Sequence, residues 1–135
     1  MKIAFAVFLF VHAFAHGVGS LTVSGVVVDE STPSEPTFLL TGLDKGHWIF
    51  KVMAIVWLIP LAGFVAAGIG VIQEADWTRT VLIATTVLST VLSLIWVKSA
   101  PFGLVANGIV FAALVVPWAA DRVIPPLAYD PRSLL

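Results

Sequence analysis

Apolar residues form four long runs along the chain, and short polar segments separate them. The runs cover residues 3–19, 47–72, 77–97 and 102–120. Each reaches or approaches the ~20 residues with which an α-helix crosses a bilayer core of about 30 Å. Helices are the expected form because backbone polar groups within a bilayer have to be satisfied inside the segment. The pattern predicts an all-α fold with four membrane-spanning helices in one domain of residues 1–135.

The connections between the later runs are short. The segment QEADWTR joins the second run to the third, and VKSAP joins the third to the fourth. Short connections make consecutive helices antiparallel neighbours. We therefore expect an up-down four-helix transmembrane bundle, with the N-terminus and a tail of residues 121–135 on the same side.

The first connection, residues 20–46, is longer and has a pattern of its own. The β-prone runs LTVSGVVV and TFLLTG flank the Pro-rich polar segment DESTPSEP. This pattern fits a small β-hairpin on the membrane surface. It fits equally well an extended end of the first helix followed by an irregular loop, because Val-rich runs are ambiguous between strand and helix.

Composition supports a membrane protein and excludes several functions. Hydrophobic residues make up 59% of the chain and charged residues 11%, whereas soluble domains have an apolar fraction near ~45–50%. A net charge of −1 without any basic run excludes nucleic acid as a partner. The absence of cysteine excludes thiol redox chemistry. The N-terminal segment imitates a signal peptide, but we interpret it as a retained first span.

Lysine and arginine near the span ends predict the orientation. The side that carries the termini has one basic residue more than the opposite side. We expect a multi-pass protein of the cell membrane with both termini in the cytoplasm. The two groups are Lys2, Arg79, Arg122 and Arg132 on the side of the termini, and Lys45, Lys51 and Lys98 on the other.

Small and hydroxyl residues recur at four-residue spacing on the two central spans. Small residues on the second span predict a face for close helix packing. The hydroxyl residues on the third span have two interpretations, which are packing with hydroxyls bonded one turn back, or a polar wall of a cavity. The small residues are Ala62, Ala66 and Gly70, with Gly63 and Ala67 beside them, and the hydroxyl residues are Thr85, Ser89 and Ser93.

Polar and amphipathic residues of all four spans fall at one depth, in the half away from the termini. His12 and His16 lie one helical turn apart in the first span, and intramembrane ionisable groups usually face protein or a water-filled cavity. We predict a ligand-binding pocket there, with Trp48 and Trp96 at its rim. Alternatively the lysines reach the interface, the tryptophans form an aromatic belt and the histidines bond neighbouring helices. The candidate ligand-binding residues are His12, His16, Lys51, Ser93, Trp96 and Asn107.

The histidines also raise the question of a cofactor. Two histidines four residues apart on a helix can share a metal ion, and His47 is the third candidate ligand beside His12 and His16. A bis-histidine haem needs ligands from separate helices. A quinone needs only hydrogen bonds or proton exchange from an imidazole. Quinone, haem and metal all stay open at this point.

Two motifs resemble a family of short four-span prokaryotic membrane proteins, which are loosely similar to DoxX-like proteins. In HAFAHGVG, His12, His16 and Gly19 match the pattern H-x-x-x-H-x-x-G, and PFGLVANGIV matches F-G-x-x-x-N. Members of that family tend to carry an acidic residue and a lysine just before F-G, whereas here Lys98 stands upstream and no acidic residue is present. The resemblance implies the four-span fold and the same polar residues, but no reaction.

Two functions follow from these observations. The first is a non-enzymatic bundle whose pocket binds a lipophilic small molecule or a lipid, or which docks on a membrane complex. The second is a quinone- or metal-associated accessory subunit of a membrane oxidoreductase, for which the DoxX-like resemblance is an analogy of fold. The expected partners are the lipid bilayer and either another membrane protein or a second copy of the chain.

Overall fold

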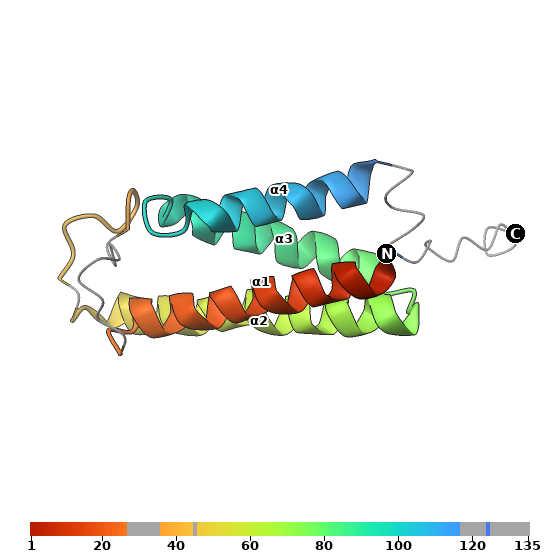
Figure 1. Ribbon diagram of the computed structural model, residues 1–135. Coiled ribbons are helices and arrows are strands. Elements are labelled where there is room, and N and C mark those ends of the chain that lie inside the picture. The colour runs from red at the N-terminus through yellow and green to blue at the C-terminus, as the bar shows by residue number, and fades with distance from the viewer. Residues whose placement is uncertain (27–35, 45, 117–123, 125–135) are drawn as a thin grey trace, which may run out of the picture.

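The computed structural model contains four helices, which Figure 1 shows as an up-down bundle. It describes residues 1–26, 36–44, 46–116 and 124, and no strand occurs among them. The N-terminus and the end of α4 lie at one end, called the N-terminal end below, and the α1–α2 connection lies at the other, called the loop end. The predicted all-α four-helix bundle is confirmed. The helices are α1 (Lys2–Val23), α2 (Trp48–Gln73), α3 (Thr78–Ile95) and α4 (Pro101–Val115).

The helices pair into two layers. Helices α1 and α2 pack along their lengths, α3 lies against both α2 and α4, and α1 makes little contact with α4. Helices α1, α2 and α3 are long and apolar enough to cross a membrane, whereas α4 is shorter. Of the four adjacent helix pairs around the bundle, α1 and α4 therefore make the weakest contact.

In its described part, the first connection is an extended end of α1 followed by an irregular loop, which is the second of the two predicted forms. Helix α1 continues to Val23, beyond the predicted end near residue 19. Residues 38–43 form turns, with Thr41 N donating to Phe38 O at 3.0 Å. Thr37 N donates to Ile95 O at 2.7 Å, which attaches this segment to the end of α3. Residues 27–35, the centre of the alternative hairpin, lie outside the described residues.

Helix α4 ends earlier than the predicted residue 120. Val116 has extended backbone angles, φ −83° and ψ 110°, and it precedes a proline, which disfavours helical backbone in the residue before it. Arg79 Nη2 donates to Leu114 O at 3.1 Å, so a side chain from the first turn of α3 satisfies a carbonyl that the end of α4 leaves free. Residues 117–120 lie outside the described residues.

The α2–α3 turn is as tight as predicted. Glu74 adopts the left-handed conformation with φ 56° and ends α2. Lys2 Nζ contacts Glu74 Oε1 at 2.7 Å, which ties the start of α1 to the end of α2. The two side chains are partly exposed, so this ion pair contributes little to stability.

Small residues of α2 let the helix approach both α1 and α3. A Cβ added at Gly68 would lie 2.7 Å from the Phe10 ring, and one at Gly63 would collide with the Thr85 side chain. Ala67 is fully buried, whereas Ala62 is exposed. The predicted packing face exists, but it includes Gly63 and Ala67 and excludes Ala62.

Gly63→Leu should lower the melting temperature in detergent by roughly 5–10 °C, because overpacking costs about 1–3 kcal/mol. The new side chain has to displace Thr85 and separate α2 from α3. Ala62→Leu is the matched control, since Ala62 is exposed one residue away, and its melting temperature should stay within 2 °C of wild type, roughly the effect of a surface substitution. Equal melting temperatures for both variants would show that Gly63 does not set the α2–α3 distance.

Candidate functional site

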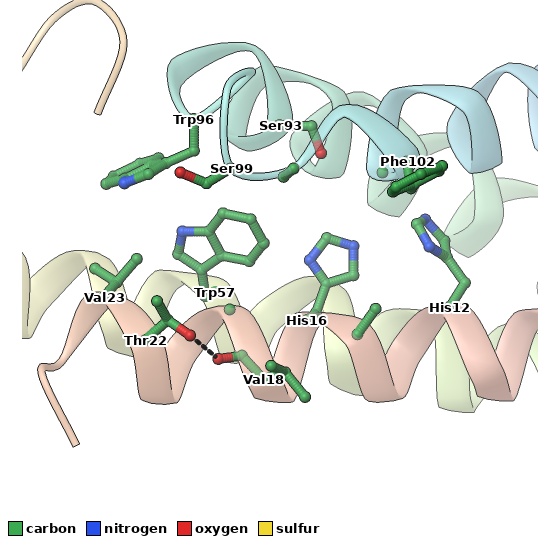
Figure 2. Close-up of a pocket in the computed structure, with 14 residues that line it drawn as sticks. His12, His16, Val18, Thr22, Val23, Trp57, Ser93, Trp96, Ser99 and Phe102 are labelled. Atoms are coloured by element: carbon green, nitrogen blue, oxygen red, sulfur yellow. Dashed lines mark hydrogen bonds between the residues drawn. The ribbon is translucent and has the colours of Figure 1, made fainter. Parts of the chain in front are cut away.

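A cavity of about 200 Å³ lies in the loop-end half of the bundle. Figure 2 shows His16 and Trp57 reaching into it from α1 and α2, and Ser93 and Trp96 from the opposite layer. The start of α4 completes the wall with Gly103. The cavity therefore lies between the two layers, where all four helices contribute to its lining.

The cavity opens sideways, between α1 and the start of α4. Ala15 and Val18 of α1 line it and are exposed, and Phe102 of α4 lines it with 85% of its surface exposed. These two helices make little contact with each other. Ala15, Val18 and Phe102 are apolar, and α1 is long and apolar enough to cross a membrane, so the rim of the opening suits a lipid environment.

Four buried polar side chains form a chain of hydrogen bonds beside the cavity. His12 Nε2 lies 2.8 Å from Asn107 Oδ1, and Ser89 Oγ donates to the same oxygen at 2.9 Å. Ser89 Oγ also lies 2.9 Å from His16 Nε2. The chain links α1, α3 and α4, so part of the polar stripe on α3 supports this site rather than bonding only within its own helix.

Several buried polar atoms of the same region have no hydrogen-bond partner. They are His16 Nδ1, Trp57 Nε1, Ser93 Oγ and Trp96 Nε1, all from residues that line the cavity, together with Asn107 Nδ2. An unpartnered buried polar group costs roughly 1–3 kcal/mol. Such groups are rare in folded proteins and call for a physical reason. Here four of the five belong to one cavity, which makes it the candidate functional site.

Aromatic rings form much of the remaining wall. The rings of His16 and Trp57 have centroids 5.2 Å apart, and Trp57 meets Trp96 edge to face at 5.9 Å. His16 also packs on Phe64 at 5.7 Å. The cavity is thus apolar along its walls, with a few polar atoms at defined positions, as is typical of small-molecule sites.

Most of the predicted site residues come together. His12, His16, Ser93 and Trp96 line the cavity. Asn107 is buried behind it and reaches it through its hydrogen bond to His12.

Lys51 and Trp48, in contrast, do not line the cavity. Both are exposed, Trp48 by 63%, whereas Phe50 and Ala54 of the same helix are buried. The structure thus does not bring Lys51 or Trp48 to this cavity. Both residues belong to the loop-end part of α2, and their exposed side chains do not reach the cavity.

Trp57 is the site residue that the sequence analysis missed. Its only signal is a spacing of seven residues, since Phe50, Trp57, Phe64 and Val71 are all buried on one face of α2. A seven-residue repeat of large side chains marks a packing face, but the rest of α2 is equally apolar and hides it.

His47 has a structural role away from the other histidines. It caps the start of α2, where its Nδ1 accepts from Ile49 N at 3.3 Å, and its ring packs on Trp48. Within residues 1–26, 36–44, 46–116 and 124, no three His, Asp or Glu side chains gather as metal ligands would. The predicted set of His12, His16 and His47 is therefore not assembled.

No family model, no curated protein and no solved structure matches this chain. The resemblance to four-span DoxX-like proteins thus stays a prediction. Its two motifs nevertheless meet in space, because His12 bonds to Asn107 and both His16 and Gly103 line the cavity. Gly19 belongs to the same wall, where a Cβ would lie 2.6 Å from the Trp57 ring.

Proposed function

We propose that this membrane protein binds a lipophilic small molecule or a lipid in the lateral cavity. The observation that carries the proposal is the group of four unpartnered polar atoms on residues of one apolar cavity. A ligand with oxygen atoms at its head would supply the missing hydrogen bonds, and its apolar part would cover the aromatic walls. No step of this proposal requires catalysis.

The size of the cavity suits a ring-sized head group. Its volume of about 200 Å³ exceeds the roughly 150 Å³ of an engineered protein cavity that binds benzene. A longer tail would leave through the opening between Val18 and Phe102 and continue in the lipid. Access from the bilayer also suits a molecule that is poorly soluble in water.

Quinones and quinols belong to this ligand class, which keeps the accessory-subunit function as the alternative. The indole N–H groups of Trp57 and Trp96 have no partners and are suitable donors for a carbonyl oxygen. A bis-histidine haem does not fit, since His12 and His16 lie on the same helix with ring centroids 5.0 Å apart and its two axial ligands have to come from opposite faces.

Mass spectrometry of the purified protein tests this proposal. We expect wild type taken from native membranes in mild detergent to retain a defined lipophilic molecule. The double variant Trp57→Phe/Trp96→Phe keeps aromatic walls but lacks both indole donors, so it should retain at least tenfold less. Trp48→Phe is the matched control and should retain the wild-type amount, because Trp48 lies outside the cavity. No defined molecule in wild type, or equal amounts in the double variant, would contradict the proposal.

We further propose that both termini face the cytoplasm, in line with the distribution of basic residues. Lys2 and Arg79 belong to the N-terminal end of the bundle, and Lys51 and Lys98 to the loop end. The acidic first connection would then face outward.

Cysteine labelling in sealed vesicles checks this orientation, because the chain has no cysteine of its own. Thr41→Cys in the first connection and Asp76→Cys in the α2–α3 turn are both at exposed positions. A membrane-impermeant maleimide should label the two from opposite sides, with Asp76→Cys on the cytoplasmic side. Labelling of both from one side would overturn the membrane-spanning arrangement, and reversed sides would overturn the orientation alone.

A further inference from the structure

The hydrogen bonds among His12, Asn107, Ser89 and His16 determine where their protons lie. The Asn107 amide is oriented with Oδ1 toward His12 and Ser89, and because this oxygen can only accept, both His12 Nε2 and Ser89 Oγ donate to it in this orientation. A hydroxyl group has a single proton, and Ser89 uses it in that bond. The Ser89 oxygen therefore accepts from His16 Nε2, which carries the proton of the His16 ring.

His16 consequently presents a bare acceptor nitrogen. A neutral imidazole with its proton on Nε2 has a lone pair on Nδ1, and His16 Nδ1 is buried without a partner. A second proton would place a charge on a side chain that is only 2% exposed and packs on Trp57 and Phe64, which is costly. Nδ1 therefore needs a hydrogen-bond donor from elsewhere.

Trp57 and Trp96 offer hydrogen-bond donors, nearer the loop end of the cavity. The indole N–H groups of Trp57 and Trp96 can only donate, and both lack an acceptor. Figure 2 shows the indole nitrogen of Trp57 on the side of its ring away from His16, toward Trp96. The cavity thus offers an acceptor at His16 and two donors at a separate place.

We infer that the occupant carries a hydroxyl group that donates to His16 Nδ1, on a ring-sized apolar head whose other oxygen atoms accept from the indoles. This inference rests on the proposed function and specifies its ligand. Phenols, quinols and alicyclic alcohols share the required chemistry. A quinone or an ether of the same shape lacks the donor and leaves Nδ1 unpaired.

A matched set of small probes tests the inference on the purified protein in detergent. The probes are 4-hexylphenol, its methyl ether 4-hexylanisole, hexylbenzene and 4-hexylcyclohexanol, with binding followed by isothermal titration calorimetry. We expect the phenol to bind at least tenfold more tightly than the ether, because a site built to accept from a hydroxyl rejects the analogue that lacks it. Comparing 4-hexylcyclohexanol with 4-hexylphenol shows whether the site prefers a hydroxyl group on an alicyclic or on an aromatic ring.

Two variants show whether His16 causes the preference. His16→Phe keeps an aromatic ring and leaves the Ser89–Asn107 bond possible, so the phenol and the ether should bind it with equal affinity. His47→Phe changes a histidine outside the cavity, so it should keep the tenfold preference. A preference that survives in His16→Phe would overturn the inference.

The outcomes for wild type separate the two proposals. Equal binding of phenol and ether, or tighter binding of the ether, would overturn the hydroxyl inference and leave the proposed function standing. No binding of any of the four probes would overturn both.

Nitrogen-15 NMR of the histidine-labelled protein gives a second readout that needs no variant to fold. We expect one imidazole with a protonated Nε2 and an unprotonated Nδ1 whose signal shifts on addition of the phenol, and a protonated His16 Nδ1 would contradict the inference.

Discussion

Replacing Asn107 with leucine is expected to lower the free energy of unfolding in detergent by about 1–3 kcal/mol, the cost of leaving a buried hydrogen-bonding group without its partner. Asn107 Oδ1 accepts from both His12 Nε2 and Ser89 Oγ, and among the described residues it is the one hydrogen-bond partner of the His12 side chain. Leucine has a similar volume, so the change removes the acceptor without opening a large cavity. Ser89 can turn to the carbonyl one helical turn back, whereas His12 has no such alternative on α1. Denaturant-induced unfolding followed by circular dichroism measures the effect.

A double-mutant cycle separates this hydrogen bond from packing. His12→Phe and Asn107→Leu should each destabilise the protein, and the double variant should be more stable than the sum of the single effects by about 0.5–2 kcal/mol. In the double variant neither the His12 donor nor the Asn107 acceptor remains, so this contact leaves no buried polar group without its partner. Strictly additive effects would show that the contact between His12 and Asn107 contributes no coupling energy.

Replacing Ala15 with phenylalanine should close the lateral opening and reduce ligand occupancy at least tenfold. Ala15 is exposed on α1 and lines the cavity opposite the start of α4. A phenylalanine ring there can cover the space that a ligand tail would cross, and it has no close-packed neighbour to displace. The melting temperature without ligand should therefore stay near that of wild type. Mass spectrometry of the retained lipophile and titration with 4-hexylphenol both measure the occupancy.

Ala4→Phe is the control for that experiment. Ala4 is also exposed on α1, but it lies near the N-terminal end and does not line the cavity. The same gain in apolar surface on the same helix should leave occupancy unchanged. If Ala15→Phe binds as wild type does, the ligand enters elsewhere, and if both variants lose binding, the effect is on α1 as a whole.

Polar residues within the spans were the most reliable guide to the site. His12, His16, Ser93 and Asn107 are all buried, because a polar group on the lipid-facing surface would have no partner in hydrocarbon. For these residues the chemistry alone determines the face of the helix. That is why a single sequence, with no structure, placed them at one depth and on the inside.

Amphipathic and apolar residues carried no such information. Trp48 and Lys51 can reach the interface from the outer face of α2 at little cost, so their depth did not imply burial. Trp57 points inward, but α2 is apolar on every side, and lipid accepts an outward tryptophan as readily as a packed core does. Hydrophobic periodicity reports the inside of a helix only where the outside is water.

The sequence by itself determined the four helices, their alternating directions and the half of the bundle that holds the polar residues, because helix length and bilayer thickness leave few alternatives. The tertiary structure decided which helices touch. It packs α1 on α2 and leaves α1 nearly free of α4, which creates the lateral opening. It also decided which polar atoms find partners and which do not. Those choices depend on distances between residues far apart in the chain, such as His12 and Asn107 at 2.8 Å, and no local pattern in the sequence encodes them.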